Sequence, residues 1–220
     1  MLDFILKHTP TGRGWRVLVT RAVPVLLLGV LVASFGCSGI LESAARLEKK
    51  GDLEGAISIY REVLADSPDN PEALSGLAVD LMLLRRYDEA LPIQERLATL
   101  DPSDAQIRVE LGFNYLNHQN SPQKAVKVLQ EAVALEPTAK NLCFLAQAQD
   151  AAREGAAAEA SLRRAISLDP GYERAYVLLI RLLDRSGRSD ELATLLESAE
   201  SHGLDPDYLR QAAGSDQSGL

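Results

Sequence analysis

The sequence predicts an all-α chain built from an internal repeat, and three observations support this prediction. Helix-forming Ala, Leu, Glu and Arg are abundant, whereas aromatic residues make up only 5% of the 220 residues. Proline recurs at intervals of 34, 35 and 33 residues, at Pro68, Pro102, Pro137 and Pro170. An alanine stands twelve residues before each proline, at Ala56, Ala90, Ala125 and Ala158. Periods of this length are typical of proteins made of stacked supersecondary units.

Two further sets of positions complete the pattern. A large residue follows each alanine by four positions, as Tyr60, Gln94, Leu129 and Leu162. Upstream of each alanine, residues 108–115 and their counterparts fit the half-pattern W-x2-L-G-x2-Y, with Leu111, Gly112 and Tyr115 in the third unit. Together these motifs resemble the tetratricopeptide repeat, a 34-residue unit of two antiparallel helices, over about residues 38–204. The resemblance implies an α-solenoid, a right-handed superhelix of about five such helix pairs, preceded by an N-terminal hydrophobic helix.

Small residues and prolines have a mechanical role in this pattern. A small residue on each first helix lets the second helix approach closely, and these residues are Ala44, Ala78, Gly112 and Ala146. The recurring alanines would do the same from the second helix. Each proline should end a second helix, because it lacks the N–H and clashes with the preceding turn. Asn70, Asp104 and Thr138 are expected to cap first helices, and Ser121 is expected to open the second helix of the third unit.

Three segments follow from the composition and the repeat. Residues 1–36 are predicted to be a signal peptide or membrane anchor, and residues 205–220 a C-terminal cap with a frayed tail. Between them, a superhelical domain over 37–204 would hold repeats at about 37–70, 71–104, 105–138, 139–171 and 172–204. The fifth unit departs from the pattern, since Leu192 replaces the small alanine.

The N-terminal segment carries a second resemblance. The run "AVPVLLLGVLVASFGCSGIL", from Ala22 to Leu41, has no charged residue and follows a segment that contains three arginines. Gly36 and Cys37 within it resemble the end of a bacterial lipoprotein lipobox, although Ser34 and Phe35 depart from that pattern. The resemblance implies that Cys37 is lipidated. An uncleaved single-pass helix and a buried core helix with an incidental cysteine are the alternatives. The first two place everything after Cys37 on the extracytoplasmic side of a membrane.

Charge and motif content exclude several classes of function. The formal net charge is −8, and the residues after position 36 carry 19 basic against 30 acidic side chains. An acidic chain of this kind is not expected to bind nucleic acid, because phosphate contacts need Lys and Arg. Its three histidines are far apart, and no motif for a metal, a nucleotide or a catalytic cysteine occurs. We therefore expect a protein that is not an enzyme, with no metal, no cofactor and no small-molecule substrate.

The resemblance also implies where a partner would bind. Stacked repeats of this family present a concave groove lined by their first helices. The predicted groove residues grade from apolar to basic, and they are Ser75, Val79, Met82, Val109, Phe113, Leu116, Gln147, Arg174, Arg181 and Arg185. A protein segment, either extended or helical, is the expected occupant. The alternative is that Val79, Met82, Val109 and Phe113 are inner packing residues. Gln94 and Glu131 are expected on the convex second helices.

The expected function is that of a scaffold or adaptor. The resemblance to tetratricopeptide lipoproteins implies a protein–protein interaction scaffold that is tethered to a bacterial membrane on its extracytoplasmic side. Such proteins assist the assembly of envelope complexes, for example a pilus or a secretion system. The alternative is an accessory subunit of an envelope-modifying or polysaccharide-export enzyme complex. The choice between them rests on fold-level analogy, because a fold does not determine a function.

Overall fold

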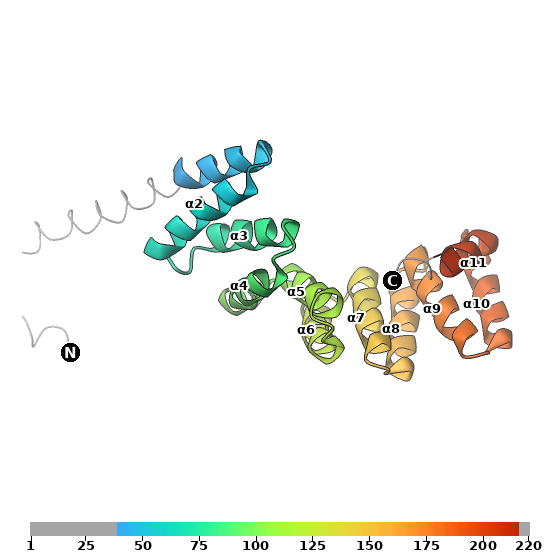
Figure 1. The fold of residues 1–220 in the computed structure, drawn as a ribbon. Coiled ribbons are helices and arrows are strands. Elements are labelled where there is room, and N and C mark those ends of the chain that lie inside the picture. Colours follow the sequence, from blue (N-terminus) through green and yellow to red (C-terminus); the bar gives the residue numbers. More distant parts are fainter. Residues whose placement is uncertain (1–38, 216–220) are drawn as a thin grey trace, which may run out of the picture. The chain divides into compact units, whose positions relative to one another are not determined.

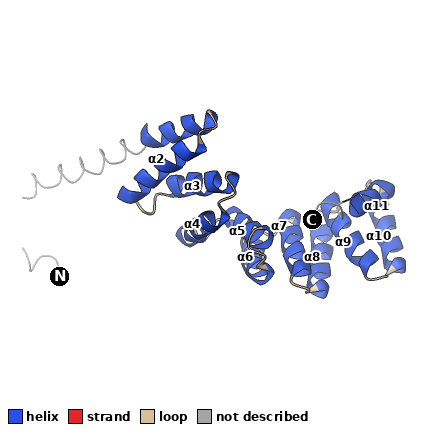
Figure 2. Cartoon of the chain, in the orientation of Figure 1, coloured by secondary structure: helices blue, strands red, loops and turns tan. Residues whose placement is uncertain are grey.

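The computed structural model describes residues 39–215, and within this range every regular element is a helix. Figure 2 shows these helices joined by short loops. The predicted N-terminal hydrophobic helix and the candidate lipidation site Cys37 lie outside the described residues. The predicted all-α architecture of antiparallel helix pairs, like those of tetratricopeptide repeats, is confirmed for the described residues, 39–215.

The helices alternate between first and second members of pairs. In chain order they are a helix over 39–49, α2 (Leu53–Asp66), α3 (Pro71–Leu83), α4 (Tyr87–Leu100), α5 (Ala105–Asn117), α6 (Pro122–Leu135), α7 (Ala139–Ala151), α8 (Gly155–Leu168), α9 (Glu173–Arg185), α10 (Ser189–Ser201) and α11 (Pro206–Ser215). The chain divides into two compact units, Met1–Asp80 and Leu81–Leu220. The first contains the helix over 39–49, α2 and most of α3, and the second contains α4 to α11.

Proline positions and helix caps agree with the sequence pattern. Each of α2, α4, α6 and α8 ends two residues before one of the recurring prolines. Asp104 caps α5 by accepting hydrogen bonds from two backbone N–H groups, and Thr138 caps α7 by accepting one from Asn141. Asn70 accepts one from the backbone of Ala73. Ser121 precedes α6 but makes no side-chain capping bond. Its hydroxyl donates instead to the carbonyl of Gln119.

The small residues of the pattern lie where two helices touch. The recurring alanines of the second helices are at most 1% exposed, and Ala44, Ala78 and Ala146 of the first helices are also buried. Gly112 of α5 shows how tight this contact is, because a Cβ atom there would stand 2.5 Å from Cγ of Leu129 on α6. The role predicted for small residues is therefore confirmed: they set the distance between the two helices of a pair.

Within the second unit the first helices form one continuous layer. α5 packs on α7, and α7 packs on α9, while α6 and α8 each fit between successive first helices. Figure 1 shows α7, α8, α9 and α10 side by side. Helix α11 packs on α9 and α10 and buries Leu209 and Ala213 against them. Helix α11 thus covers this side of α9 and α10.

Candidate functional site

The side of α5, α7 and α9 that the second helices leave uncovered carries most of the predicted groove residues. We call it the first-helix face and define it by six residues of the second unit: Phe113, Leu116, Gln147, Arg174, Arg181 and Arg185. All six are exposed or half-buried. The face needs only the second unit, so it can be described without reference to the first.

Hydrogen bonds show that neighbouring first helices share this face. An Nη2 of Arg174 on α9 donates to Oε1 of Gln147 on α7 at 3.3 Å. Further along the same helices, Nη2 of Arg185 lies 2.6 Å from Oδ2 of Asp150 in an ion pair. Three of these four side chains, those of Gln147, Arg174 and Arg185, stand at predicted groove positions. Since all four side chains remain partly accessible to solvent, these pairs contribute little to stability and can exchange for contacts with a partner.

An aromatic cluster lies at the carboxyl end of α5. The ring of His118 stacks on that of Tyr87, with centroids 3.6 Å apart and an angle of 8° between planes. Phe113 meets the edge of His118 at 6.3 Å between centroids. Phe113 itself is 47% exposed, which is unusual for a phenylalanine. Burial, and secondarily the charge of Arg85, lowers the pKa of His118, so its ring is neutral at neutral pH.

One predicted groove position turns out differently. Val109 is only 4% exposed and belongs to the core between α5 and its neighbours, so it is not a groove residue. Gln94 lies on the second helix α4, as expected, and is buried there, at 7% exposed, where it accepts a hydrogen bond from Asn114 of α5 at 2.7 Å. Val109 was misplaced because a register position says which way a side chain points but not how closely the next repeat covers it.

The remaining predicted residues are placed as follows. Met82 is half-buried near the end of α3. Ser75 and Val79 are exposed on α3, and both belong to the first unit. Val79 is 51% exposed, which favours a surface position over a packing position. Glu131 is exposed on α6, as expected, and accepts a hydrogen bond from Arg108.

Cys143 has no reactive character. It is 1% exposed on α7, and burial raises the pKa of its thiol to about 12 against a smaller opposing effect of Arg174. A thiol that stays protonated is neither a good nucleophile nor a metal ligand. Among residues 39–215, no group of three or more His, Cys, Asp or Glu side chains is placed to hold a metal ion. No described helix combines the length and the apolar character that crossing a membrane demands.

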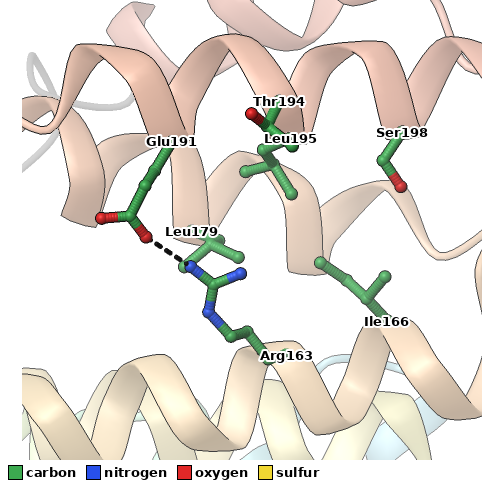
Figure 3. Close-up of a pocket in the computed structure, with 7 residues that line it drawn as sticks. All are labelled: Arg163, Ile166, Leu179, Glu191, Thr194, Leu195 and Ser198. Carbon is green, nitrogen blue, oxygen red and sulfur yellow. Dashed lines mark hydrogen bonds and ion pairs between the residues drawn. The ribbon is translucent and has the colours of Figure 1, made fainter.

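A hollow lies on the side of the second unit that the second helices form. Its walls come from α8 and α10, and Leu179 of α9 forms its floor, in a space of about 350 Å³. Figure 3 shows Arg163 reaching across it to Glu191, at 3.1 Å between Nη2 and Oε2. Leu192 of α10, which replaces the small alanine of earlier units, is partly buried against the core.

Comparison with known proteins identifies the repeats. Residues 47–108 match the family described as tetratricopeptide repeat. The TPR repeat-containing protein YpiA of Bacillus subtilis (strain 168) is 27% identical over 168 residues, which are 75% of this chain and 39% of YpiA. The chain therefore spans well under half the length of that relative.

Solved structures agree on the fold. A crystal structure of MamA is 27% identical and has a TM-score of 0.66, covering 74% of this chain and 89% of that one. YrrB, described as a TPR protein with an unusual peptide-binding site, has a TM-score of 0.65 at 18% identity. The match covers 81% of this chain and 90% of the YrrB chain. At 18% identity the likeness is one of fold alone. The repeat register, the helix pairs and these likenesses agree, and the chain resembles proteins of the tetratricopeptide-repeat family.

Proposed function

We propose that this chain is a scaffold that holds a segment of a partner protein on its first-helix face, and that it works outside the cytoplasm at a bacterial membrane. There it assists the assembly of an envelope complex, such as a pilus or a secretion system. One observation carries the binding proposal: Phe113 presents a half-exposed ring next to the stacked Tyr87 and His118. Large exposed aromatic side chains are typical anchors of protein interfaces.

Charge adds a preference to this apolar anchor. Arg174 and Arg185 are exposed on α9, and Arg181 is half-buried on the same helix, in a chain whose net charge is −8. A partner with an apolar side chain for the Phe113 region and a carboxylate for α9 therefore fits the face. The arginines should mainly set orientation and association rate, because exposed charges are screened at physiological salt.

Crosslinking in intact cells tests this proposal. A photoreactive residue in place of Phe113 should capture a specific protein, and Phe113→Ala should weaken binding of that protein roughly tenfold or more, because a large apolar side chain contributes about 1.5–3 kcal/mol on burial. The matched control is Gln130, which is exposed on α6. Capture from position 130 with none from position 113 would move the binding surface to the second helices and refute the proposal.

The membrane location rests on the sequence of residues 22–41, which lie almost wholly outside the described residues. If Cys37 is lipidated, a clickable fatty-acid analogue should label the wild-type protein, and Cys37→Ser should remove that label. Several acyl chains hold a protein at a membrane far more firmly than one. Cys143→Ser is the control, because it removes the other cysteine without touching the segment. Label that persists in Cys37→Ser would contradict lipidation at this residue.

A further inference from the structure

Asp80 of α3 is a buried carboxylate that the proposed function does not use. It is 1% exposed, and its Oδ2 atom makes no hydrogen bond to any described residue. Buried carboxylates are rare unless they are paired, because an isolated charge loses its hydration without compensation. The position therefore calls for either a partner cation or a proton on the carboxylate itself.

The groups around Asp80 in the first unit supply no positive charge. Besides burial, the charge of Glu48, on the helix over 39–49, raises the pKa of Asp80. Besides burial and a side-chain hydrogen bond, the charge of Asp80 in turn raises the pKa of Tyr60 on α2, as does the charge of Glu72 on α3. The one phenolic proton is already used, since the hydroxyl of Tyr60 donates to Oε1 of Glu48 at 2.5 Å. Asp80 therefore lies near a second carboxylate, that of Glu48, and the hydroxyl of Tyr60 does not donate to it.

We call the contact between a first helix and the second helix of the preceding repeat a joint. The next joint along the chain has uncharged side chains at the equivalent positions. Asn114 and Gln94 stand 34 residues after Asp80 and Tyr60, so each pair joins the first helix of one repeat to the second helix of the repeat before. Nδ2 of Asn114 donates to Oε1 of Gln94 at 2.7 Å, and both residues are buried. One further repeat along, the first-helix position is Ala148, which is 0% exposed. Of these three equivalent joints, the one at Asp80 carries the titratable first-helix group.

The environment moves the titration of Asp80 toward neutral pH. Burial, and then the charge of Glu48, raises the pKa of Asp80 to about 6 from an ordinary value of 3.8. Because the pKa is higher in the folded state, the proton on Asp80 stabilises the folded joint. That stabilisation is fully present below the unfolded-state pKa, and it is lost as the pH rises through about 6.

We infer that Asp80 makes the contact between α3 and the first helix pair, residues 39–66, sensitive to protons. When Asp80 is protonated, the first helix pair stays packed against α3 at the contact that also contains Tyr60 and Glu48. With an ionised Asp80 a buried negative charge lies within the electrostatic reach of the half-buried Glu48, and the pair opens more often. The device concerns residues of the first unit, so it is independent of binding at the first-helix face.

Hydrogen exchange of the full-length chain tests this inference. In wild type, the opening equilibrium constant reported by α2 amides should rise about tenfold between about pH 5 and about pH 7.5, after correction for intrinsic exchange. In Asp80→Asn, which reproduces the neutral chemistry of Asn114, the increase should disappear. Amides of α6 and α7 serve as the internal reference, because their joint has Ala148 at the equivalent position. An equal increase for α2 in wild type and Asp80→Asn would overturn the inference.

The reciprocal change keeps the test decisive if Asp80→Asn folds poorly. Asn114→Asp should give the joint between α4 and α5 a pH-dependent opening that wild type lacks there, while α2 keeps its own. Glu48→Gln should reduce the dependence at α2, because it removes the negative charge that opposes ionisation of Asp80. No pH dependence at α4 and α5 in Asn114→Asp, or an undiminished one at α2 in Glu48→Gln, would count against the mechanism.

Discussion

Replacing Leu129 with alanine should lower the free energy of unfolding of the second unit by about 2–5 kcal/mol, the usual cost of a large-to-small change in a core. Leu129 is 1% exposed on α6 and fills the space directly over Gly112 of α5. The alanine would leave a cavity at the tightest point of the α5–α6 contact, where the two backbones have little freedom to collapse. Urea unfolding followed by circular dichroism gives the loss directly.

The same contact predicts that Gly112→Ala destabilises the wild-type protein but stabilises the Leu129→Ala variant. In wild type, the added Cβ would stand 2.5 Å from Leu129 Cγ, so overpacking of about 1–3 kcal/mol should outweigh the helix propensity that alanine brings. In the Leu129→Ala background that space is empty, and the same methyl group should restore stability. The two substitutions should therefore be strongly non-additive in a double-mutant cycle.

Gly155→Ala is the matched control for this cycle. Gly155 is also helical, at the start of α8, but a Cβ there would meet nothing within 4 Å. Its replacement should be neutral or slightly stabilising in both backgrounds. If Gly112→Ala behaves like Gly155→Ala in wild type, the tight approach of α5 and α6 is not real, and the role assigned to Gly112 is wrong.

The register of the helix pairs was predictable because it depends on steric rules that act within one repeat. An alanine between two helices and a proline after the second helix have the same consequence in every unit, so Ala90 and Pro102 could be assigned without knowing their neighbours. Helix ends followed from these positions to within a residue or two. The candidate face was predictable only in part, for a different reason: exposure depends on two repeats at once. Val109 and Phe113 lie four residues apart on one helix, yet one is core and the other is open to solvent.

Features that depend on a particular turn or a particular pair of repeats could not be predicted. His118 stacks on Tyr87 at the start of the connection over residues 118–121, in which Asn120 adopts a φ of 47°. A charged residue within a helical pattern normally indicates a solvated face, so the burial of Asp80 had no signal in the sequence. That Asp80 is buried at the position equivalent to the buried Asn114 is evident only from the structure.

Arg108 is another buried charge, and here the structure shows what compensates it. The residue is 8% exposed on α5 at a position where the repeat pattern has an aromatic ring. Its guanidinium donates to the carbonyl oxygens of Asp104 at 2.9 Å, Asp101 at 3.3 Å and Ala98 at 3.4 Å. These carbonyls belong to the end of α4 and to the turn after it, where a helix leaves acceptors without intrahelical partners. Arg108 therefore fastens the turn between two repeats.

Arg108→Ala should lower the free energy of unfolding by about 1.5–3 kcal/mol, the contribution of hydrogen bonds to a charged group, because it leaves these acceptors unsatisfied. The ion pair with Glu131 should matter much less. Its atoms are 3.3 Å apart, and the Glu131 side chain is 49% exposed, so solvent screens the attraction. Glu131→Gln should change stability by less than about 1 kcal/mol. Urea unfolding at low and high salt separates the two roles, because the loss in Arg108→Ala should persist at high salt whereas any loss in Glu131→Gln should vanish. Equal losses for the two variants would mean that the ion pair, and not the fastening of the turn, is what Arg108 contributes.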